Sequence, residues 1–176
     1  MKINKKKLQA IASIAMGKGG FKEELKAIYY HIDGEKAYLV ATDAFHLVRV
    51  EVEKTIDESV IIPRHAIDDV IKTWDNKIST FEIYGNKEQG YKIGNINFKG
   101  LDAQYPDYQK IMNTEENYAI EGLKTMTISL ETLETGLKAL NTLLDGDRIT
   151  FEINEENKPI RVMEGDVYYM IMPAIR

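Results

Sequence analysis

Cysteine is absent from this 176-residue sequence. Its absence excludes a disulfide framework, a thiolate metal site and a cysteine nucleophile, and it fits a reducing cytoplasm better than secretion. Long hydrophobic runs are also lacking, because no stretch reaches the roughly twenty apolar residues of a membrane-spanning helix. We therefore expect a cytoplasmic protein without a membrane span.

The amino-terminal stretch Lys2–Gly17 imitates a secretory signal in part, since Lys5–Lys7 precede the apolar-leaning LQAIASIAMG. Gln9 and Ser13 interrupt that stretch. Its apolar residues recur at helical spacing, at Leu8, Ile11, Ala12 and Ala15. An amphipathic helix is therefore the better interpretation.

Excess positive charge is lacking as well. The chain has 23 basic and 28 acidic residues and a net charge of −5. A protein that coats nucleic acid by bulk attraction usually has a basic domain. The composition argues against that class, but it leaves room for a local basic stripe.

A catalytic constellation is also missing. The GKGG at Gly17–Gly20 lacks the spacing and the following serine or threonine of a phosphate-binding loop, so we interpret it as a flexible loop. The histidines His31, His46 and His65 have no ligand-like spacing. The acidic pairs are typical of solvated turns and helix faces. We expect no enzyme, no catalytic residue, no metal site and no cofactor.

What the sequence does contain is a repeat. Three segments of about 55 to 60 residues share the order strand, helix, strand, strand, strand. With 44% hydrophobic residues, the chain can bury a sizeable core. Alternating apolar residues in the strands and one apolar face on each helix predict an α+β fold. It would consist of three β-α-β-β-β units with the helices on one face of antiparallel sheets.

The second and third copies are the clearest. Each begins with a short strand that runs into a helix, SVIIP before RHAIDDVIKTW and TMTIS before LETLETGLKALNTLL. Pro63 suits a first helical turn and Ser129 a helix cap. Three strands follow each helix, and in RITFEIN Phe151 alternates as a core-facing residue does. Each helix should lay its apolar face on a sheet, and these faces comprise Ile67, Val70, Ile71 and Trp74, and Leu130, Leu133, Leu137, Leu140 and Leu144.

The first copy fits more loosely. MKIN predicts a strand, KKKLQAIASIAMG a helix, and LKAIYYHID, KAYLVATD and HLVRVEVE three strands with a hairpin turn at Asp33–Gly34. The acidic segment Met112–Lys124 lacks periodicity and is the predicted boundary between the second and third copies. We expect a complete domain over residues 1–113, with units at about 1–54 and 58–111, and a half domain over 114–176.

Four stretches resemble one family. LVATDAFHLVRVEVE at Leu39–Glu53 is similar to a signature that reads alanine, threonine, aspartate, glycine, histidine, arginine, leucine, and YPDYQKI at Tyr105–Ile111 to a phenylalanine-proline-aspartate-tyrosine turn. VIIPRHAIDDVIK is similar to the same family's strand-to-helix entry, and YYMIMPAIR to its methionine-proline ending. They occur in the family's order. The chain resembles a bacterial DNA sliding clamp, the beta subunit of DNA polymerase III, shortened to about one and a half domains.

The resemblance covers most of the chain. Residues 1–113 resemble the middle domain of the three-domain clamp, and 114–176 resemble the second half of its last domain. The resemblance implies a clamp fold in a ring of paired units, with helices around a hole and sheets outside. Such a ring slides on duplex DNA, while a surface pocket captures short peptides from polymerases, loaders and repair proteins.

The resemblance also implies where that peptide pocket lies. An apolar groove with polar edges suits the leucine and phenylalanine of an extended peptide, and methionine helps it adapt to several partners. Three walls follow from the matching positions: Leu25, Thr42, Ala44, Phe45, His46 and Leu47, then Pro106 and Ile111, then Met170 and Met172.

Two features complicate this assignment. Ala44, Phe45 and His46 stand where the family has glycine, histidine and arginine, which bears on the peptide sequence preferred. Apolar strand positions such as Leu47 and Met170 are also ordinary core residues in most proteins. The order and spacing of the four motifs favour the pocket.

DNA contact would rest on basic residues of the inward-facing helices, because a sliding protein touches phosphates without reading bases. The candidates are Lys5, Lys6, Lys7, Arg64, Lys72 and Lys138. Solvated helix faces are the alternative, since acidic residues share the later two helices.

Self-association is expected because three units leave one unit without a partner in its own chain. The family's rings contain twelve units, so three units per chain would require four chains. The alternative is a clamp relative that does not encircle DNA but keeps the pocket, and so competes for clamp-binding peptides or regulates the host clamp.

Overall fold

The computed structural model describes residues 3–15, 22–74, 81–112, 128–144, 149–153 and 159–172. In the first unit, the helix α1 (Lys5–Ala15) precedes a short 3-10 helix, η1 (Glu23–Lys26), and the strands β1 (Ile28–Asp33), β2 (Lys36–Thr42) and β3 (His46–Val52). α1 begins where the side chain of Asn4 accepts a hydrogen bond from the backbone N–H of Lys7, at 3.0 Å. The hairpin between β1 and β2 turns at Gly34, whose φ of 59° favours glycine.

The second and third units repeat this order. The second contains β4 (Val60–Ile62), α2 (Arg64–Thr73), β5 (Ile83–Asn86), β6 (Gly90–Ile93) and β7 (Ile96–Phe98), and the third contains α4 (Leu130–Leu143), β8 (Glu152–Ile153), β9 (Ile160–Glu164) and β10 (Val167–Ile171). A short helix, α3 (Tyr108–Met112), follows the second unit. The predicted α+β class, with a helix and three strands recurring in each unit, is therefore confirmed.

The strand expected ahead of each helix is seen in the second unit, as β4. At the other two positions the described residues, Ile3–Asn4 and Ile128–Ser129, do not form a strand. Met1–Lys2 and Thr125–Thr127 lie outside the described residues, as do the predicted loop at Gly17–Gly20 and most of the predicted boundary, from Asn113 onward. Ser129 occupies the cap position of α4, but its side chain makes no capping hydrogen bond.

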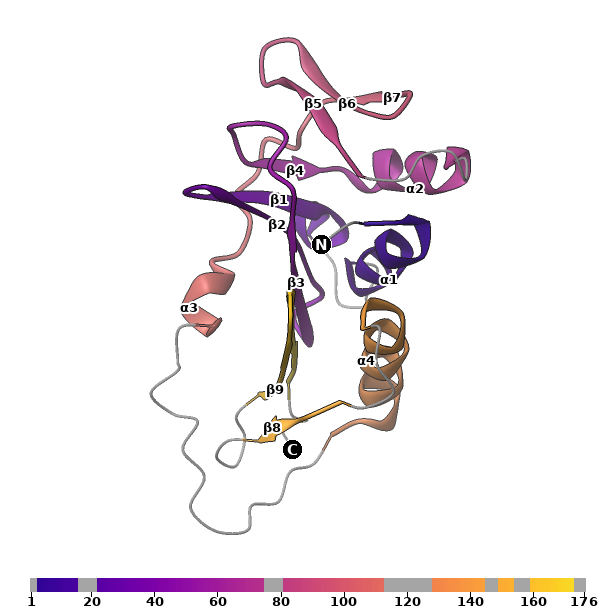
Figure 1. The fold of residues 1–176 in the computed structure, drawn as a ribbon, viewed down its shortest axis with the longest axis vertical. Coiled ribbons are helices and arrows are strands. Elements are labelled where there is room, and N and C mark those ends of the chain that lie inside the picture. The colour runs from indigo at the N-terminus through magenta and orange to yellow at the C-terminus, as the bar shows by residue number, and fades with distance from the viewer. Residues whose placement is uncertain are drawn as a thin grey trace.

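One long antiparallel sheet joins the units. Its seven strands run in the order β4-β1-β2-β3-β10-β9-β8, and β5, β6 and β7 form a second sheet. β4 of the second unit pairs with β1 of the first, and β10 of the third pairs with β3 of the first, so that Leu47 lies opposite Met170. The first unit thus lies between the other two (Figure 1).

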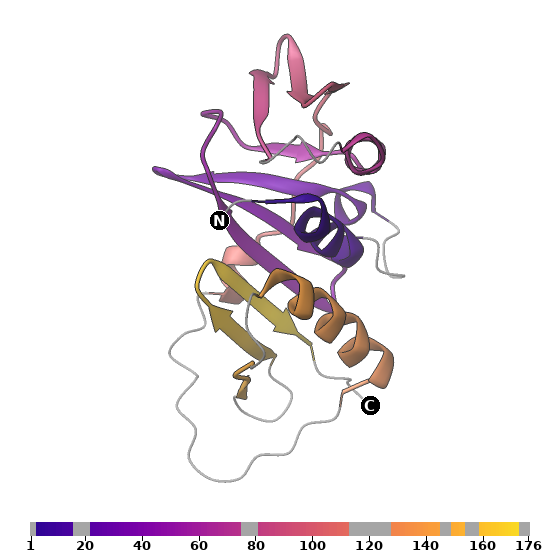
Figure 2. The same ribbon diagram turned by 45° about the vertical axis from the view of Figure 1, so that its right-hand side comes forward.

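The helices α1, α2 and α4 lie together on one side of the strands, and α3 lies on the other side (Figures 1 and 2). Alternation along each strand divides the side chains between two apolar clusters. Leu39, Val48 and Tyr169 belong to the inner cluster, under the helices. Val40, Leu47 and Met170 belong to the outer cluster, which α3 and the chain before it cover. None of the described helices has the length and apolar character to cross a membrane.

Two expectations about the third unit's core were wrong. The apolar face of α4 does not lie wholly on the sheet: Leu140 and Leu144 are buried, whereas Leu130 is 84% and Leu137 38% exposed. Phe151, expected to face the core, is exposed. Both errors have one cause, because periodicity identifies an apolar face but not whether the chain supplies something to cover it.

α4 lies close to the sheet at Gly136. A Cβ atom there would come within 2.9 Å of the Tyr169 hydroxyl and 3.0 Å of the Ile171 side chain. Glycine therefore allows the helix to approach β10 directly.

Tyr169 offers a test of this packing. Its side chain is fully buried, and its hydroxyl has no hydrogen-bond partner within the described part of the chain. Removing the hydroxyl alone, in Tyr169→Phe, should leave the free energy of unfolding unchanged or raise it by about 1 kcal/mol, because a buried unpaired hydroxyl is unfavourable. Removing the ring, in Tyr169→Ala, should lower it by about 3 to 5 kcal/mol. Urea unfolding measures both, and a clear loss of stability in Tyr169→Phe would contradict the packing described.

Candidate functional site

A tight loop between β2 and β3 forms one side of the candidate site. The Asp43 carboxylate accepts hydrogen bonds from the backbone N–H groups of Phe45 (2.9 Å) and His46 (2.7 Å). The Thr42 hydroxyl donates to the His46 carbonyl (2.6 Å) and accepts from the Ala44 N–H (3.2 Å). The turn places Ala44 at a φ of 75°, a left-handed conformation that glycine adopts more easily. These bonds hold Phe45 out in solvent, where its side chain is 53% exposed.

His46 fixes this loop to the third unit. Its side chain is only 4% exposed. Nδ1 lies 3.0 Å from an Asp43 carboxylate oxygen, and Nε2 lies 2.9 Å from the backbone carbonyl of Thr132 in α4. Both partners are acceptors, so both ring nitrogens donate only when the imidazole is protonated. The geometry therefore favours the charged imidazolium.

The environment moves both ionisable groups in the same sense. Burial alone lowers the pKa of His46, but the hydrogen bond to Asp43, the bond to Thr132 and the attraction of the carboxylate outweigh it and raise that pKa above 6.5. Burial likewise works to raise the pKa of Asp43, but its bonds to His46 and Phe45 dominate and lower it. Tyr169, whose ring centroid is 6.1 Å from that of His46, is the other titratable neighbour, and burial raises its pKa. Asp43 and His46 thus form a buried ion pair near neutral pH.

The floor of the candidate site lies where β3 meets β10. Leu47 and Met170 are buried opposite each other, in the outer cluster with Tyr105, Tyr108 and Met112. Just beyond β10, the backbone N–H of Met172 donates to the Phe45 carbonyl at 2.8 Å. Segments far apart in the sequence therefore meet around one apolar surface.

The remaining predicted residues lie at the border of this surface. Pro106 and Met172 are half-buried, and Ile111 on α3 is 45% exposed. Leu25 is half-buried in η1, which contacts β2. The structure thus brings the loop, α3 and the end of β10 to the same apolar surface, while the buried Thr42 and His46 support it from below.

Sequence reasoning missed the tyrosines. Tyr105 and Tyr108 are both buried, and the Tyr105 hydroxyl donates to the Val40 carbonyl at 3.4 Å. Their rings cover the sheet and hold the chain that bears Pro106 and Ile111. The signal was present, because both tyrosines belong to the YPDY motif.

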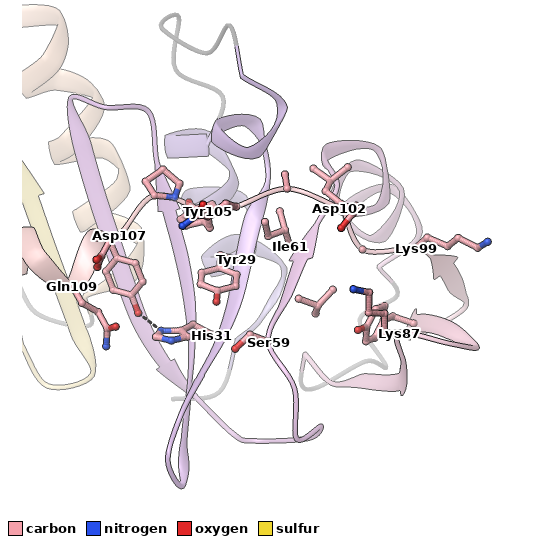
Figure 3. A pocket seen from close by; sticks show the side chains of 18 residues that line it. Tyr29, His31, Ser59, Ile61, Lys87, Lys99, Asp102, Tyr105, Asp107 and Gln109 are labelled. Atoms are coloured by element: carbon pink, nitrogen blue, oxygen red, sulfur yellow. Dashed lines mark hydrogen bonds between the residues drawn. The ribbon is translucent and has the colours of Figure 1, made fainter.

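A hollow of about 580 Å³ lies next to this surface, between β1, β4 and the chain from Lys99 to Gln109 (Figure 3). Of the predicted pocket residues, Pro106 alone lines it. The ring of Tyr29 stacks on Tyr105, with centroids 4.8 Å apart, and on His31, with centroids 5.1 Å apart. The hollow is therefore distinct from the predicted peptide groove, and its aromatic wall is packed internally.

His31 anchors the far side of that wall. Its Nδ1 is hydrogen bonded to the Tyr108 hydroxyl, the bond drawn in Figure 3. Burial and the nearby Arg49 lower the pKa of His31, although Asp33 opposes them. The lowered pKa favours neutral His31, which keeps its hydrogen bond to the Tyr108 hydroxyl without burying a charge.

The predicted DNA-contacting residues all lie on the three helices of the inner side. α1 carries Lys5, Lys6 and Lys7 and no acidic residue, although Lys7 is buried. On α2, Arg64 pairs with Asp68 at 2.8 Å and Lys72 with Asp69 at 3.6 Å. On α4, Lys138 pairs with Glu134 at 2.6 Å. α1 is therefore the basic part of this side, and α2 and α4 contribute no excess of positive charge.

The buried pair makes stability depend on pH. Because the pKa of His46 is raised in the folded state, protonation of His46 stabilises the fold. This contribution is fully present below pH 6.5, the ordinary pKa of histidine, and is lost as the pH rises from 6.5 through the raised pKa of the folded state. The free energy of unfolding of His46→Gln should lack this decline, and should itself be lower by about 3 kcal/mol because Asp43 is left buried without its partner.

Urea unfolding at several pH values between 6 and 9 measures this dependence. His65→Gln is the control, since His65 is exposed and should retain the wild-type decline. An unchanged pH dependence in His46→Gln would show that another group titrates.

A family model described as the central domain of the DNA polymerase III beta subunit matches residues 2–107. No curated protein matches.

Several solved structures share the fold. The beta clamp of Helicobacter pylori bound to a DNA ligase peptide has a TM-score of 0.74 and 18% identity, over 98% of this chain and 63% of that one. The Bacillus subtilis sliding clamp has a TM-score of 0.70 and 15% identity, over 98% of this chain and 62% of that one. The Pseudomonas aeruginosa clamp has a TM-score of 0.70 and 15% identity, over 100% of this chain and 66% of that one. The chain thus spans less than two thirds of the length of these clamps. Since the family model covers more than half of the chain, the protein belongs to the DNA polymerase III beta subunit family of sliding clamps.

Proposed function

We propose that this protein is a non-enzymatic replication processivity factor that self-associates around duplex DNA. It would tether DNA polymerase, and other proteins that carry clamp-binding peptides, through an apolar groove. The proposal joins three parts, a peptide groove, a DNA-facing side and a ring, and each has its own support.

The apolar surface at the junction of β3 and β10 carries the proposal. Phe45, two residues before buried Leu47, and Ile111, next to buried Met112, have exposed side chains. Half-buried Met172 follows β10 and donates a backbone hydrogen bond to the Phe45 carbonyl. Exposed apolar side chains that border a packed apolar surface are typical of a binding site. An extended peptide with leucine and phenylalanine suits such a surface, and methionine accommodates variation among partners.

The relatives support the class of partner. The Helicobacter pylori clamp is described as bound to a DNA ligase peptide. In this chain, alanine, phenylalanine and histidine occupy loop positions 44 to 46. Phe45 adds an exposed ring at the rim, so the preferred peptide should differ from that of relatives with other residues there.

The helix side supports DNA contact through phosphates. Exposed Lys6 and half-buried Lys5 lie on α1, between α2 and α4 (Figure 1). Lysines on a helix contact phosphates without reading bases, which sliding requires. Arg64, Lys72 and Lys138 are weaker contributors because each has an acidic partner.

Ring closure rests on arithmetic. If a complete ring holds twelve units, three units per chain require four chains. The third unit supports self-association, because its helix α4 exposes apolar residues.

A second function is favoured by the charges. With acidic partners on α2 and α4, a protein that does not encircle DNA could still use the groove to compete for clamp-binding peptides or to regulate the host clamp. This alternative needs the groove and neither the basic helix nor self-association.

The groove can be tested with Ile111→Glu and Phe45→Ala. Each should weaken binding of a labelled peptide with adjacent leucine and phenylalanine by about tenfold or more, because the apolar border is lost or charged. Fluorescence anisotropy measures the affinity. Met163→Glu is the matched control, since Met163 is a similarly exposed apolar residue at 51% on β9. If both variants bind like wild type, or if the control loses as much, the groove is wrongly placed.

The ring can be tested by light scattering and by retention on DNA. A species of four chains should remain on covalently closed circular duplex in a salt wash and leave when the circle is cut, because only topology holds it. Replacing Lys5 and Lys6 together by Glu should weaken association with linear DNA by at least about threefold at low salt.

Lys110→Glu, on α3 at the other side of the sheet, is the matched control for the lysine variant and should bind DNA as wild type does. A monomer at all concentrations, or equal retention on cut and closed circles, would exclude the ring and favour the non-encircling alternative.

A further inference from the structure

The exposed side of α4 is an apolar stripe. Its residues recur at the spacing of one helix face, and they border a groove with Ile149. The leucines of this stripe are Leu130, Leu133 and Leu137, and the polar residues Glu134, Lys138 and Asn141 line the same groove beside them. The opposite side of α4 is buried against α1 and the sheet, at Gly136, Ala139, Leu140 and Leu143. An exposed leucine stripe on a helix that is already packed on its other side is typical of an interface.

An open sheet edge belongs to the same unit. β8 is the last strand of the seven-stranded sheet, and within the described residues only β9 pairs with it. Its other edge has no partner strand among the described residues, and proteins usually pair or cover such an edge.

The chain itself shows how this fold closes such an end. In the first unit β1 occupies the place that β8 has in the third, and β4 of the second unit pairs with β1. The helix α2, which follows β4 directly, packs against α1. A neighbouring unit therefore supplies both a strand for the edge and a helix for the helix face. The third unit lacks such a neighbour among the described residues.

We propose that a second copy of this chain covers the stripe, with the two α4 helices packed antiparallel about a two-fold axis at the middle of the helix. The charges fit this occupant. Glu134 and Lys138, which pair with each other at 2.6 Å within one helix, stand on either side of that midpoint. Each Glu134 therefore also comes near the partner copy's Lys138, so that two ion pairs become one network of four charges. The leucines of both helices then cover one another, and the two β8 edges come to the same side.

This contact would be one of the interfaces that the proposed ring requires, and in that respect it rests on the proposed function. Lys138 would then bind the partner copy instead of contacting DNA. Because a two-fold axis reverses one copy relative to the other, neighbouring copies would present their peptide grooves on opposite faces of a ring.

Leu137→Glu tests the apolar part. Leu137 is exposed, so the variant should keep the wild-type circular dichroism spectrum and melting behaviour. Self-association measured by light scattering should weaken by about 30-fold or more, because a charge enters the centre of the contact. Ile111→Glu, with similar exposure on α3, should associate like wild type. Unchanged association of Leu137→Glu would overturn the proposal.

A charge exchange tests the antiparallel geometry. In the proposed contact, residue 134 of each copy faces residue 138 of the other, and these two places are the crossings. Glu134→Lys alone puts two lysines at each crossing, and Lys138→Glu alone puts two glutamates there, so each variant should associate at least about tenfold more weakly. An equimolar mixture of the two variants should regain association, because the crossings then join opposite charges. A mixture that stays as weak as its components would overturn this arrangement, while Lys110→Glu controls for a surface charge change.

The two proposals fail differently. In a four-chain ring the α4 variants leave dimers held by a second contact, and in a two-chain assembly they leave monomers. Normal assembly of the α4 variants, together with wild-type retention on circular DNA, would overturn this contact and leave the ring in place. If the wild-type protein assembles but does not bind the peptide or does not remain on circular DNA, the proposed function is overturned and the contact stands.

Discussion

The antiparallel pairing of β10 with β3 is the interaction on which the rest of the structure depends. It joins the first unit to a strand more than a hundred residues away in the chain, and it places Leu47 opposite Met170. At the end of this pairing, His46 reaches the Thr132 carbonyl of α4 and Met172 reaches the Phe45 carbonyl. The loop that bears Phe45 is therefore held by groups from the third unit. A binding surface at this junction exists only while the two units remain joined.

Much of the fold could be predicted from the sequence because its elements are strongly patterned. Alternating residues in β1 to β3 and the apolar faces of α1 and α2 have partners within the chain, so pattern and burial agree. α4 has the same periodicity, yet Leu130 and Leu137 are exposed. Periodicity reports that a face prefers burial, and only the arrangement of neighbouring units decides whether it is buried.

The motifs could suggest where a candidate site lies, but they could not specify its contacts. The loop of Thr42–Leu47 and the YPDY segment do approach the same surface. The burial of His46, however, depends on which side of the sheet its side chain takes, and on a carbonyl of a helix 86 residues further along. Tyr105 and Tyr108 likewise pack on strands from another part of the chain. Such contacts are tertiary, and no local pattern specifies them.

Charge and closure are linked in the proposed ring. Of the described helices on this side, α1 alone carries an excess of positive charge, in a chain whose net charge is −5. So few phosphate contacts give weak binding that falls with salt. A protein that grips DNA from one side would need more of them, whereas an encircling protein is held by topology and slides more freely when its contacts are weak. The weak charge of the helices therefore serves a clamp only if the third unit finds its partner, which makes the exposed leucines of α4 as important to the proposed function as the lysines of α1.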